Sequence, residues 1–551
     1  MSASSRANPS AGISSSTFSA DSRAVADTHA RRLGWSGPAW GAIGATTAFL
    51  ALTFWWLTQD RSIPIFDAGT QLETVLEYRS ILARGDLLGP FTFENVYPIL
   101  GHIVGAISAL IGGMGVAAPI VGENLVFVPL LALGCYQTGK LLFGRLAGML
   151  AVIFVLGSPL LISMFHVFLL DAPLAAMVAL AMWLVLASED FSRVGMSGLA
   201  GLAVGLGLNV KVQVGLFLFG LVVVALLHGG WRNRRGFALF CVVALVVGTP
   251  WYVQHSNELE RMFNLASSGP GTPPGNIPPT FTIENLLWYF WSILNSQLLA
   301  PLFALAVAGI AWLTVDVVRA RGKHAARLEF LLGGFLAWFA ITFPDSHHDI
   351  RYGLPILGFL AVAATGWIVM LPRPGRTAAI VLLVAAVAAN TLGITFGVGS
   401  DARLNLVHTP PSTEAFPDQI LLYQTSGFLA AAPSRDGDVP GLLAALRREG
   451  VRTVSWSFEQ SQLPDFSLEG LKPLVRIAGL EKAITERPQY VREASVVTLV
   501  HEAVSASKPA TCTRLSNGTG VWVVRYDEAA GKLAYYCPGH GAGYYAVGAV
   551  R

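Results

Sequence analysis

Six ionisable residues lie beside apolar segments, where a charged side chain is costly. They are Asp67, Asp171, Lys211, His347, His348 and Arg351. At the centre of a membrane helix a charge costs roughly 2.5–3.5 kcal/mol, so residues of this kind usually face a cavity or a functional site. A carboxylate can deprotonate an acceptor hydroxyl, and cations can neutralise a departing phosphate. One carboxylate beside several cations therefore suits the transfer of a group from a phosphate ester.

Structural explanations compete with this chemistry. Asp67 could be an interfacial acid that follows a membrane helix. Asp171 could cap a helix beginning at Ala172–Pro173, because Asp before an early Pro is a frequent helix start. Lys211 lies between two short apolar runs and could extend its ammonium group to the interface. Basic residues favour the cytosolic side of a membrane, and the side predicted for Lys211 is the other one, which favours a function.

The remaining residues of this group adjoin a late apolar run. Arg351 and Tyr352 begin that run and could anchor it in the interface. His347 and His348 could be solvated loop residues. Their predicted position on the same side as Asp67 slightly favours a role in a site.

The composition is that of a membrane protein. Of 551 residues, 53% are hydrophobic and 13% are charged, whereas soluble proteins carry about 25% charged residues. Several apolar runs approach the roughly 20 residues that cross the hydrocarbon core as a helix. The formal net charge of +3 gives no indication of nucleic-acid binding.

The distribution of Lys and Arg orients the predicted helices. The first apolar run follows Arg23, Arg31 and Arg32, so we expect an uncleaved helix with a cytosolic N-terminus. If residues 98–114 spanned the membrane, later basic loops would fall outside, so we interpret them as an interfacial or re-entrant helix. Eleven membrane helices are then predicted, near residues 38–57, 120–138, 147–165, 172–187, 196–210, 212–228, 236–252, 299–316, 328–344, 352–371 and 377–397.

Three regions follow from this pattern. Residues 1–35 are rich in Ser and Ala and are expected to form a disordered cytosolic tail. Residues 36–397 form the transmembrane domain, whose first outer loop, 58–119, carries interfacial helices. Residues 398–551 form an extracytoplasmic domain. The predicted fold class is an all-α polytopic membrane protein of about eleven transmembrane helices with a C-terminal soluble α/β domain.

The C-terminal region alternates strand and helix patterns. A helix is expected at 474–485, where Pro473 would suit its start, and another at 441–449. Strands are expected at 419–423, 451–458, 496–501 and 521–526. Cys512 and Cys537 could form a disulfide if this region is outside the cytosol, whereas Cys135 and Cys241 lie in apolar runs and are interpreted as packing residues.

Six short motifs follow one another along residues 38–372. They are Phe66-Asp67-Ala68-Gly69, Tyr97-Pro98-Ile99-Leu100-Gly101-His102, the segment 141–148, Leu170-Asp171-Ala172-Pro173-Leu174, the segment 205–211 and Arg351-Tyr352-Gly353-Leu354-Pro355. Their order, spacing and predicted sides resemble the family C (GT-C fold) membrane glycosyltransferases, in particular the bacterial relatives of protein O-mannosyltransferases and lipid A aminoarabinose transferases.

This resemblance implies a sugar donor linked to polyprenyl phosphate and inversion at the anomeric carbon. By the same resemblance Asp67 is the general base, Lys211 and Arg351 are phosphate ligands, and Asp171 orients a basic partner or the acceptor. His102, His348 and Tyr352 stand in or beside the motifs and are further candidates for substrate binding. The family often has a second acid after the first, so Ala68 is a departure that Glu73 or Glu77 could compensate.

We therefore expect a glycosyltransferase of the bacterial plasma membrane that acts at the extracytoplasmic face. Its partners would be membrane lipids, the lipid-linked sugar donor and a glycan, lipid or protein acceptor, and no nucleic acid. No cofactor or metal ligand is assigned from the sequence, and the use of a divalent metal stays open. The alternatives are a polytopic lipid or solute transporter or flippase, and a membrane scaffold that presents the C-terminal domain.

Overall fold

A computed structural model describes the chain over residues 37–60, 62, 64, 66–258, 260, 279–320, 324–345 and 348–399, and over 403–408, 419–424, 453–458, 468–479, 481–482, 496–501, 522–527 and 532–536. The tail at 1–35, the helix expected at 441–449, His347 and the pair Cys512 and Cys537 lie outside these described residues.

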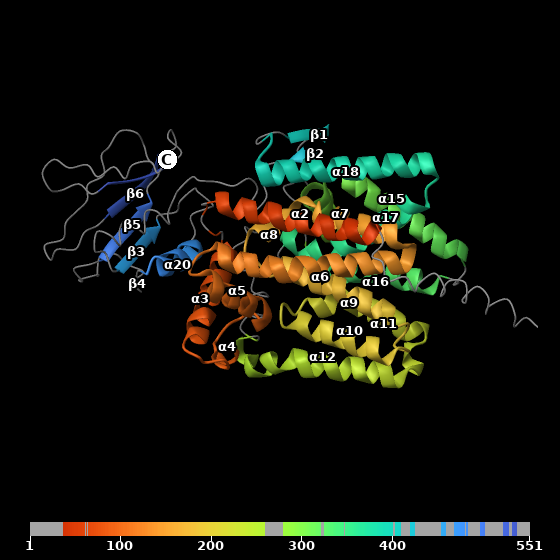
Figure 1. Cartoon of the computed structure of the whole chain (residues 1–551), viewed down its shortest axis with the longest axis horizontal. Coiled ribbons are helices and arrows are strands. Elements are labelled where there is room, and N and C mark those ends of the chain that lie inside the picture. The colour runs from red at the N-terminus through yellow and green to blue at the C-terminus, as the bar shows by residue number, and fades with distance from the viewer. Residues whose placement is uncertain are drawn as a thin grey trace, which may run out of the picture.

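Helices form most of the described chain up to residue 399, and the long ones run roughly along one axis (Figure 1). The first half contains α2 (Gly37–Gln59), α3 (Phe66–Ala83), α4 (Gly89–Thr92), α5 (Ile99–Gly112), α6 (Ala117–Phe143), α7 (Arg145–Leu156), α8 (Pro159–His166), α9 (Asp171–Ala187), α10 (Val194–Leu208) and α11 (Val214–His228). The second half contains η1 (Gly230–Arg232), α12 (Arg234–Gln254), α14 (Ile283–Ser292), η2 (Ile293–Leu298), α15 (Leu299–Ala320), α16 (Ala325–Thr342), η3 (Ile350–Ile356), α17 (Leu357–Met370) and α18 (Arg373–Phe396).

The predicted polytopic helical fold is confirmed. By length and composition, seven helices of the described chain can cross a membrane, or eight if the bent pair α7–α8 is one span. The other three expected spans correspond to α9, α10 and α11, which are apolar but only 15 to 17 residues long. At 1.5 Å per residue, a 15-residue helix reaches about 22 Å, less than a hydrocarbon core of about 30 Å. The 14 residues of α5 are shorter still.

The helix expected at 147–165 is broken in two. α7 ends at Leu156, α8 begins at Pro159, and the two helices differ in direction by 62°. Pro159 has no N–H group and its ring crowds the preceding turn, which favours a break there, and Pro159 takes the first position of the new helix. The break turns α8 away from the line of α7.

Small residues let α10 and α12 approach closely. A side-chain carbon built on Gly201 would lie 2.4 Å from the carbonyl oxygen of Phe240, and one on Gly205 would lie 2.8 Å from Cβ of Val247. Without side chains at these positions the two backbones can pack against each other, which is how small residues promote helix contacts in membranes. α10 in turn packs on α9, whose residues are almost all buried. α9 is thereby enclosed by neighbouring helices, among them α6, α10 and α11.

The C-terminal strands form two separate sheets. β1 (Arg403–His408) and β2 (Gln419–Gln424) pair antiparallel, and β2 lies near α15 and α18. A five-stranded sheet has the order β4-β3-β5-β6-β7 and contains β3 (Thr453–Phe458), β4 (Glu481–Lys482), β5 (Val496–His501), β6 (Trp522–Asp527) and β7 (Lys532–Tyr536). The first four of these strands are parallel, and α20 (Leu468–Ile477) connects β3 to β4. This α/β arrangement agrees with the predicted class of the C-terminal region.

The helix expected at 474–485 is wrong in both of its boundaries. α20 begins earlier, at Leu468, and Pro473 lies inside it. The helix ends before Gly479, which has a φ of 68°. A left-handed glycine is a common helix terminator, so the chain leaves the helix here and continues into β4.

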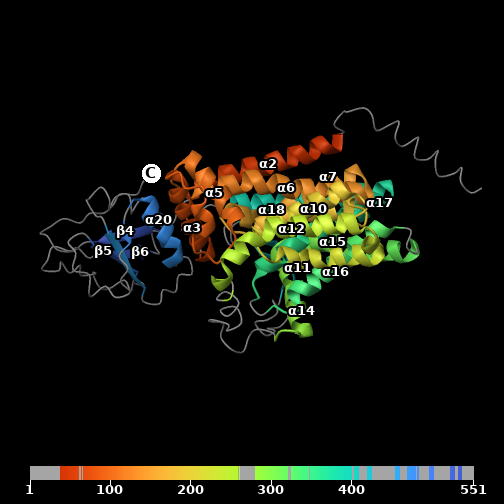
Figure 2. The ribbon, with the colours of Figure 1, turned by 90° about the horizontal axis from the view of Figure 1, so that it is seen from below.

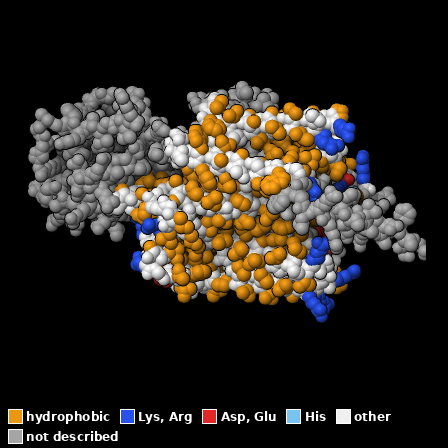
Figure 3. All heavy atoms as spheres, in the orientation of Figure 1, with side chains coloured by type: hydrophobic (Ala, Val, Ile, Leu, Met, Phe, Trp, Pro, Cys, Tyr) orange, Lys and Arg blue, Asp and Glu red, His pale blue; other side chains and the backbone are white. Residues whose placement is uncertain are grey.

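The two ends of the bundle differ in charge. Helix α3 lies at one end, where it packs against α5 and α20 (Figure 2). Lys and Arg side chains gather at the other end, on the right in Figure 3, while hydrophobic side chains cover much of the surface between. The exposed basic residues of the described helix connections include Arg145, Arg193, Arg232, Arg234, Arg235 and Arg373. We refer to these two ends as the α3 end and the basic end.

Candidate active site

Asp67 lies in the first turn of α3, where the partial positive charge of a helix N-terminus favours a carboxylate. Its Oδ2 is 3.0 Å from Nη2 of Arg351, a residue 284 positions away in the sequence. The Asp67 side chain is 52% exposed and that of Arg351 is 12% exposed. Asp67 is therefore accessible to a substrate while it touches a largely buried cation.

Arg351 is fixed by its neighbour Asp349 at the start of η3. The backbone N–H of Arg351 donates to Oδ1 of Asp349 at 2.9 Å, and its Nε donates to Oδ2 at 2.9 Å. Burial tends to raise the pKa of Asp349. The hydrogen bonds and charge of Arg351 together outweigh this effect, so the pKa of Asp349 lies below its usual value. Asp349 stays ionised and orients the guanidinium group.

Asp171 and Lys211 form a buried ion pair. Nζ of Lys211 is 2.7 Å from Oδ1 of Asp171, and the side chains are 11% and 4% exposed. Asp171 begins α9, and Lys211 lies in the break between α10 and α11. The Asp171 side chain forms no cap on α9, and Lys211 does not reach into solvent. Both purely structural explanations offered for these residues therefore fail in this geometry.

Arg351 joins the two ion pairs. Its Nη1 is 3.9 Å from Oδ2 of Asp171, while its Nη2 contacts Asp67. Asp67, Asp171, Lys211, Asp349 and Arg351 thus form one connected group, which we call the ionic cluster. It contains three carboxylates and two cations, drawn from four segments of the chain. Four of its members are residues that the sequence had nominated for a site.

Two tyrosines border the ionic cluster. Nζ of Lys211 lies 5.6 Å from the centre of the Tyr352 ring, which is within the range of a cation–π contact. Burial, followed by the charges of Asp67 and Asp171, raises the pKa of Tyr97 to about 12. The Tyr97 phenol is therefore protonated at physiological pH and can act as a hydrogen-bond donor. Tyr352 was a sequence candidate, whereas Tyr97 entered only as part of a motif.

The two histidine candidates lie in other surroundings. His102 is fully buried in α5, where its Nδ1 is 3.1 Å from the carbonyl oxygen of Pro98 and its Nε2 contacts Gln71 of α3. The ring of His348 lies 5.0 Å from that of Trp288 on α14. The contacts found for His102 among the described residues are with Pro98, Gln71 and neighbouring aromatic rings, and none of them reaches the ionic cluster.

The acids expected to compensate for Ala68 have a different partner. Glu73 is 3.2 Å from Nη1 of Arg476 on α20, and Glu77 contacts the same guanidinium nitrogen. Nη2 of Arg476 donates to the hydroxyl of Ser80 at 3.3 Å. These contacts lie about two to four turns beyond Asp67 on α3, so Glu73 and Glu77 hold the C-terminal helix instead of joining the ionic cluster.

Sequence reasoning missed two acidic residues near the site. Asp349 belongs to the ionic cluster, and Glu123 of α6 is completely buried close enough to Asp171 for their charges to interact. Neither carboxyl oxygen of Glu123 has a hydrogen-bond partner within the described part of the chain. A glutamate inside the apolar run at 120–138 was the available signal, because an acid at membrane depth is itself unusual.

The helical bundle is that of a polytopic membrane protein, and its candidate site lies at one end of the bundle. Residues 97–253 match the model of a family described as dolichyl-phosphate-mannose-protein mannosyltransferase. For this part of the chain, the resemblance indicated by the sequence motifs is confirmed. Asp171 and Lys211 lie within the matched segment, and Asp67 and Arg351 lie outside it. No curated protein matches the chain at a significant level.

Several solved structures are similar to the chain. ArnT from Cupriavidus metallidurans in the apo state is 19% identical with a TM-score of 0.47, over 62% of this chain and 62% of that one. The same protein bound to undecaprenyl phosphate is 18% identical with a TM-score of 0.46, over 64% and 65%. The oligosaccharyltransferase of Archaeoglobus fulgidus in complex with zinc and sulfate is 12% identical with a TM-score of 0.44, over 80% and 62%. The chain thus spans less than two thirds of the length of each.

Proposed function

We propose that the protein is a membrane glycosyltransferase that moves a sugar from a polyprenyl-phosphate donor to an acceptor hydroxyl. The observation that carries this proposal is the contact between Asp67 and Arg351, which places one accessible carboxylate beside buried cations. The match of residues 97–253 to the mannosyltransferase family supports the same chemistry. In this proposal the site opens to the extracytoplasmic side of a bacterial plasma membrane.

The ionic cluster divides the reaction between its members. Asp67 accepts the proton of the acceptor hydroxyl as its oxygen attacks the anomeric carbon. The bond between that carbon and the phosphate oxygen breaks, and polyprenyl phosphate leaves with the electron pair. Arg351 and Lys211 stabilise the negative charge that develops on the phosphate. Asp171 and Asp349 keep these two cations in place before the donor arrives.

An apolar cavity that borders the end of the η3 segment suits the lipid part of such a donor. It has a volume of about 460 Å³ and lies between α14, α15, α16 and α17. Its lining is almost entirely apolar and includes Phe303, Trp338 and Phe359. Ile356, at the end of the η3 segment that carries Arg351, also lines it. In this proposal the polyprenyl chain occupies the cavity and its phosphate lies toward the Arg351 end of η3.

Substitution of Asp67 tests the proposed base. Asp67→Asn keeps the size of the side chain but cannot accept a proton, so we expect transfer to fall by about 10²- to 10⁴-fold. The measurement is transfer of labelled sugar from a panel of polyprenyl-phosphate sugars by the purified protein in lipid nanodiscs. The matched control is Glu94→Gln, which removes an exposed acid between α4 and α5.

The results for the wild type and the two variants distinguish a glycosyltransferase from a flippase. Equal activity of Asp67→Asn and the wild type would remove Asp67 as the base. Movement of a labelled lipid across the bilayer by a wild-type protein that transfers no sugar would instead identify a flippase. Loss of transfer in both variants would mean that removing any acid from the segment 58–119 impairs the protein, which would contradict a specific role of Asp67.

A further inference from the structure

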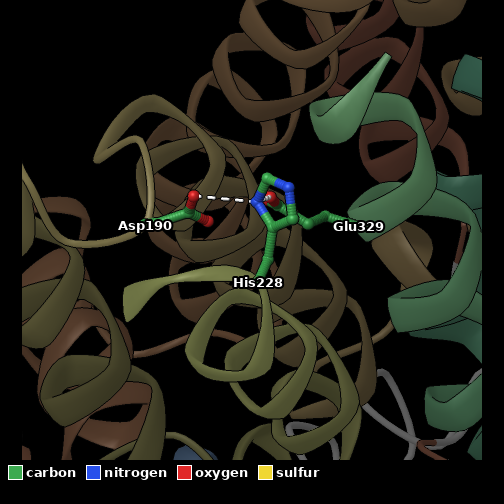
Figure 4. A group of neighbouring side chains, drawn as sticks. All are labelled: Asp190, His228 and Glu329. Atoms are coloured by element: carbon green, nitrogen blue, oxygen red, sulfur yellow. Dashed lines mark hydrogen bonds and ion pairs between the residues drawn. The ribbon is translucent and has the colours of Figure 1, made fainter. Parts of the chain in front are cut away.

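Three potential metal ligands meet at the basic end of the bundle (Figure 4). Asp190 lies in the turn between α9 and α10, His228 is the last residue of α11, and Glu329 lies near the start of α16. Their ligand atoms are all within 4.8 Å of one another. The 17 residues of α9 separate this group from Asp171, a length of about 25 Å. The group is therefore distinct from the ionic cluster.

Both carboxylates face the same imidazole nitrogen. Nδ1 of His228 is 2.9 Å from Oδ2 of Asp190 and 3.1 Å from Oε1 of Glu329. A ring nitrogen carries at most one proton and can donate it to only one of them. The Glu329 side chain is only 7% exposed and is aimed into this group, so its charge is not relieved by water. The single Nδ1 proton therefore cannot be donated fully to both carboxyl groups at once.

Few other groups in the described part of the chain contact these two carboxyl groups. Oδ1 of Asp190 is buried and has no hydrogen-bond partner within the described part of the chain. The nearby Arg193 pairs with Glu189, and the ion pairs found for Asp190 and Glu329 among the described residues involve only His228. A cation placed between the three ligand atoms would contact all of them, because they lie within 4.8 Å of one another.

The ligand types and spacing select a class of cation. Zn²⁺ binds imidazole nitrogen and carboxylate oxygen at about 2.0–2.2 Å, and tetrahedral ligands at that distance are about 3.3 Å apart. The two measured separations, 2.9 and 3.1 Å, are close to this value. Mg²⁺ and Ca²⁺ prefer sites made of oxygen alone, so the imidazole favours a transition metal.

The backbone around Asp190 also holds its carboxylate in place. Nδ2 of Asn233 donates to the carbonyl oxygen of Asp190 at 2.7 Å. The N–H of Phe191 donates to the hydroxyl of Ser188 at 3.2 Å. Hydrogen bonds of this kind orient metal ligands before the ion binds.

We propose that Asp190, His228 and Glu329 bind one divalent transition metal ion of the Zn²⁺ type. The ion would link the α9–α10 turn, the end of α11 and the start of α16, with water in the fourth coordination position. Because α11 packs along α16, the link closes one end of an existing helix pair. The site is structural and takes no part in sugar transfer at the α3 end.

Metal binding can be measured on the full-length protein, purified without a polyhistidine tag and stripped with a chelator. After equilibrium dialysis against ZnCl₂, we expect about one zinc per chain and a higher thermal unfolding temperature. His228→Ala and the more conservative Glu329→Gln should each weaken zinc binding at least tenfold. His324→Ala is the matched control, because His324 lies at the same end with a similar exposure, 42% against 40%, and pairs with Asp316.

Three results of the zinc-binding experiment would overturn the proposal. Absence of zinc from the wild type after dialysis, or the same zinc content and affinity in Glu329→Gln as in the wild type, would overturn the proposal. Loss of zinc from His324→Ala to the same extent as from His228→Ala would assign the metal to a different place and also overturn it. Asp67→Asn should bind zinc like the wild type, so failure of the catalytic proposal does not affect this result.

Discussion

Asp171 determines the charge balance at the centre of the candidate site. It is almost completely buried, contacts Lys211 at 2.7 Å and lies 3.9 Å from Arg351. Desolvating a carboxylate and an ammonium group is expensive, and their attraction offsets that cost only while both are present. The two charges are therefore better understood as a coupled unit than as separate stabilising residues.

A double-mutant cycle tests this coupling. Lys211→Met leaves the buried carboxylate of Asp171 with only the more distant Arg351, and Asp171→Asn leaves the ammonium group of Lys211 unpaired. Each single change should lower stability by about 3–5 kcal/mol, whereas the double variant should lose less than either. Thermal unfolding of the four proteins in one detergent measures the effect. Additive losses would contradict a coupled pair.

Residue positions were predictable where charge interrupts an apolar pattern at a helix end. Asp67, Asp171, Lys211 and Arg351 were assigned to one side of the membrane from the basic loops alone, and the structure brings them into contact. The ion pairs themselves were not predictable, since Arg351 meets Asp67 across 284 positions. Glu123 was overlooked because a single acid inside an apolar run leaves the run recognisable as a helix.

At the scale of elements, α3 connects the candidate site to the C-terminal sheet. It carries Asp67 at its first turn and binds Arg476 of α20 through Glu73, Glu77 and Ser80 further along. Burial raises the pKa of Glu73, and the charge of Arg476 opposes that rise. Arg476 thus offsets part of the charge of Glu73 and Glu77 on the helix that positions the proposed base.

Charge reversal tests this connection. Arg476→Glu places three carboxylates together, so we expect α3 to pack less tightly and its amides to exchange hydrogen faster. Exchange can be followed by mass spectrometry on peptides from residues 66–83. The combined variant Arg476→Glu with Glu77→Arg should restore slow exchange. If neither variant changes the exchange of α3, the contact with α20 has no influence on this helix.

Element types were easier to predict than element boundaries. The lengths of the hydrophobic runs predicted most helices. The interpretation of residues 98–114 as an interfacial or re-entrant helix agrees with the 14-residue length of α5. The break at Pro159 and the early start of α20 depend on local backbone geometry that a count of apolar residues does not contain. The seven or eight spans found by length, against eleven expected, have the same origin, because α9, α10 and α11 are short for a bilayer.

At the scale of the whole molecule, the basic end and the α3 end predict an orientation in the membrane. Basic residues favour the cytosolic side, so the α3 end would face outward. Single cysteines at Trp231 and Pro344, both exposed, can be introduced after the four native cysteines are replaced. In intact cells, a membrane-impermeant thiol reagent should label position 344 and spare position 231. Labelling of both or of 231 alone would contradict this orientation.

The ion pair between Asp67 and Arg351 has a consequence for the order of events in catalysis. With no donor bound, the proposed base is held by the cation that the departing phosphate needs. A donor phosphate that takes over Arg351 would release Asp67, so productive turnover would proceed through an ordered ternary complex with the donor first. Initial-rate kinetics should then show polyprenyl phosphate competing with the donor but not with the acceptor. A competitive pattern against the acceptor would mean that Asp67 is ready before the donor binds.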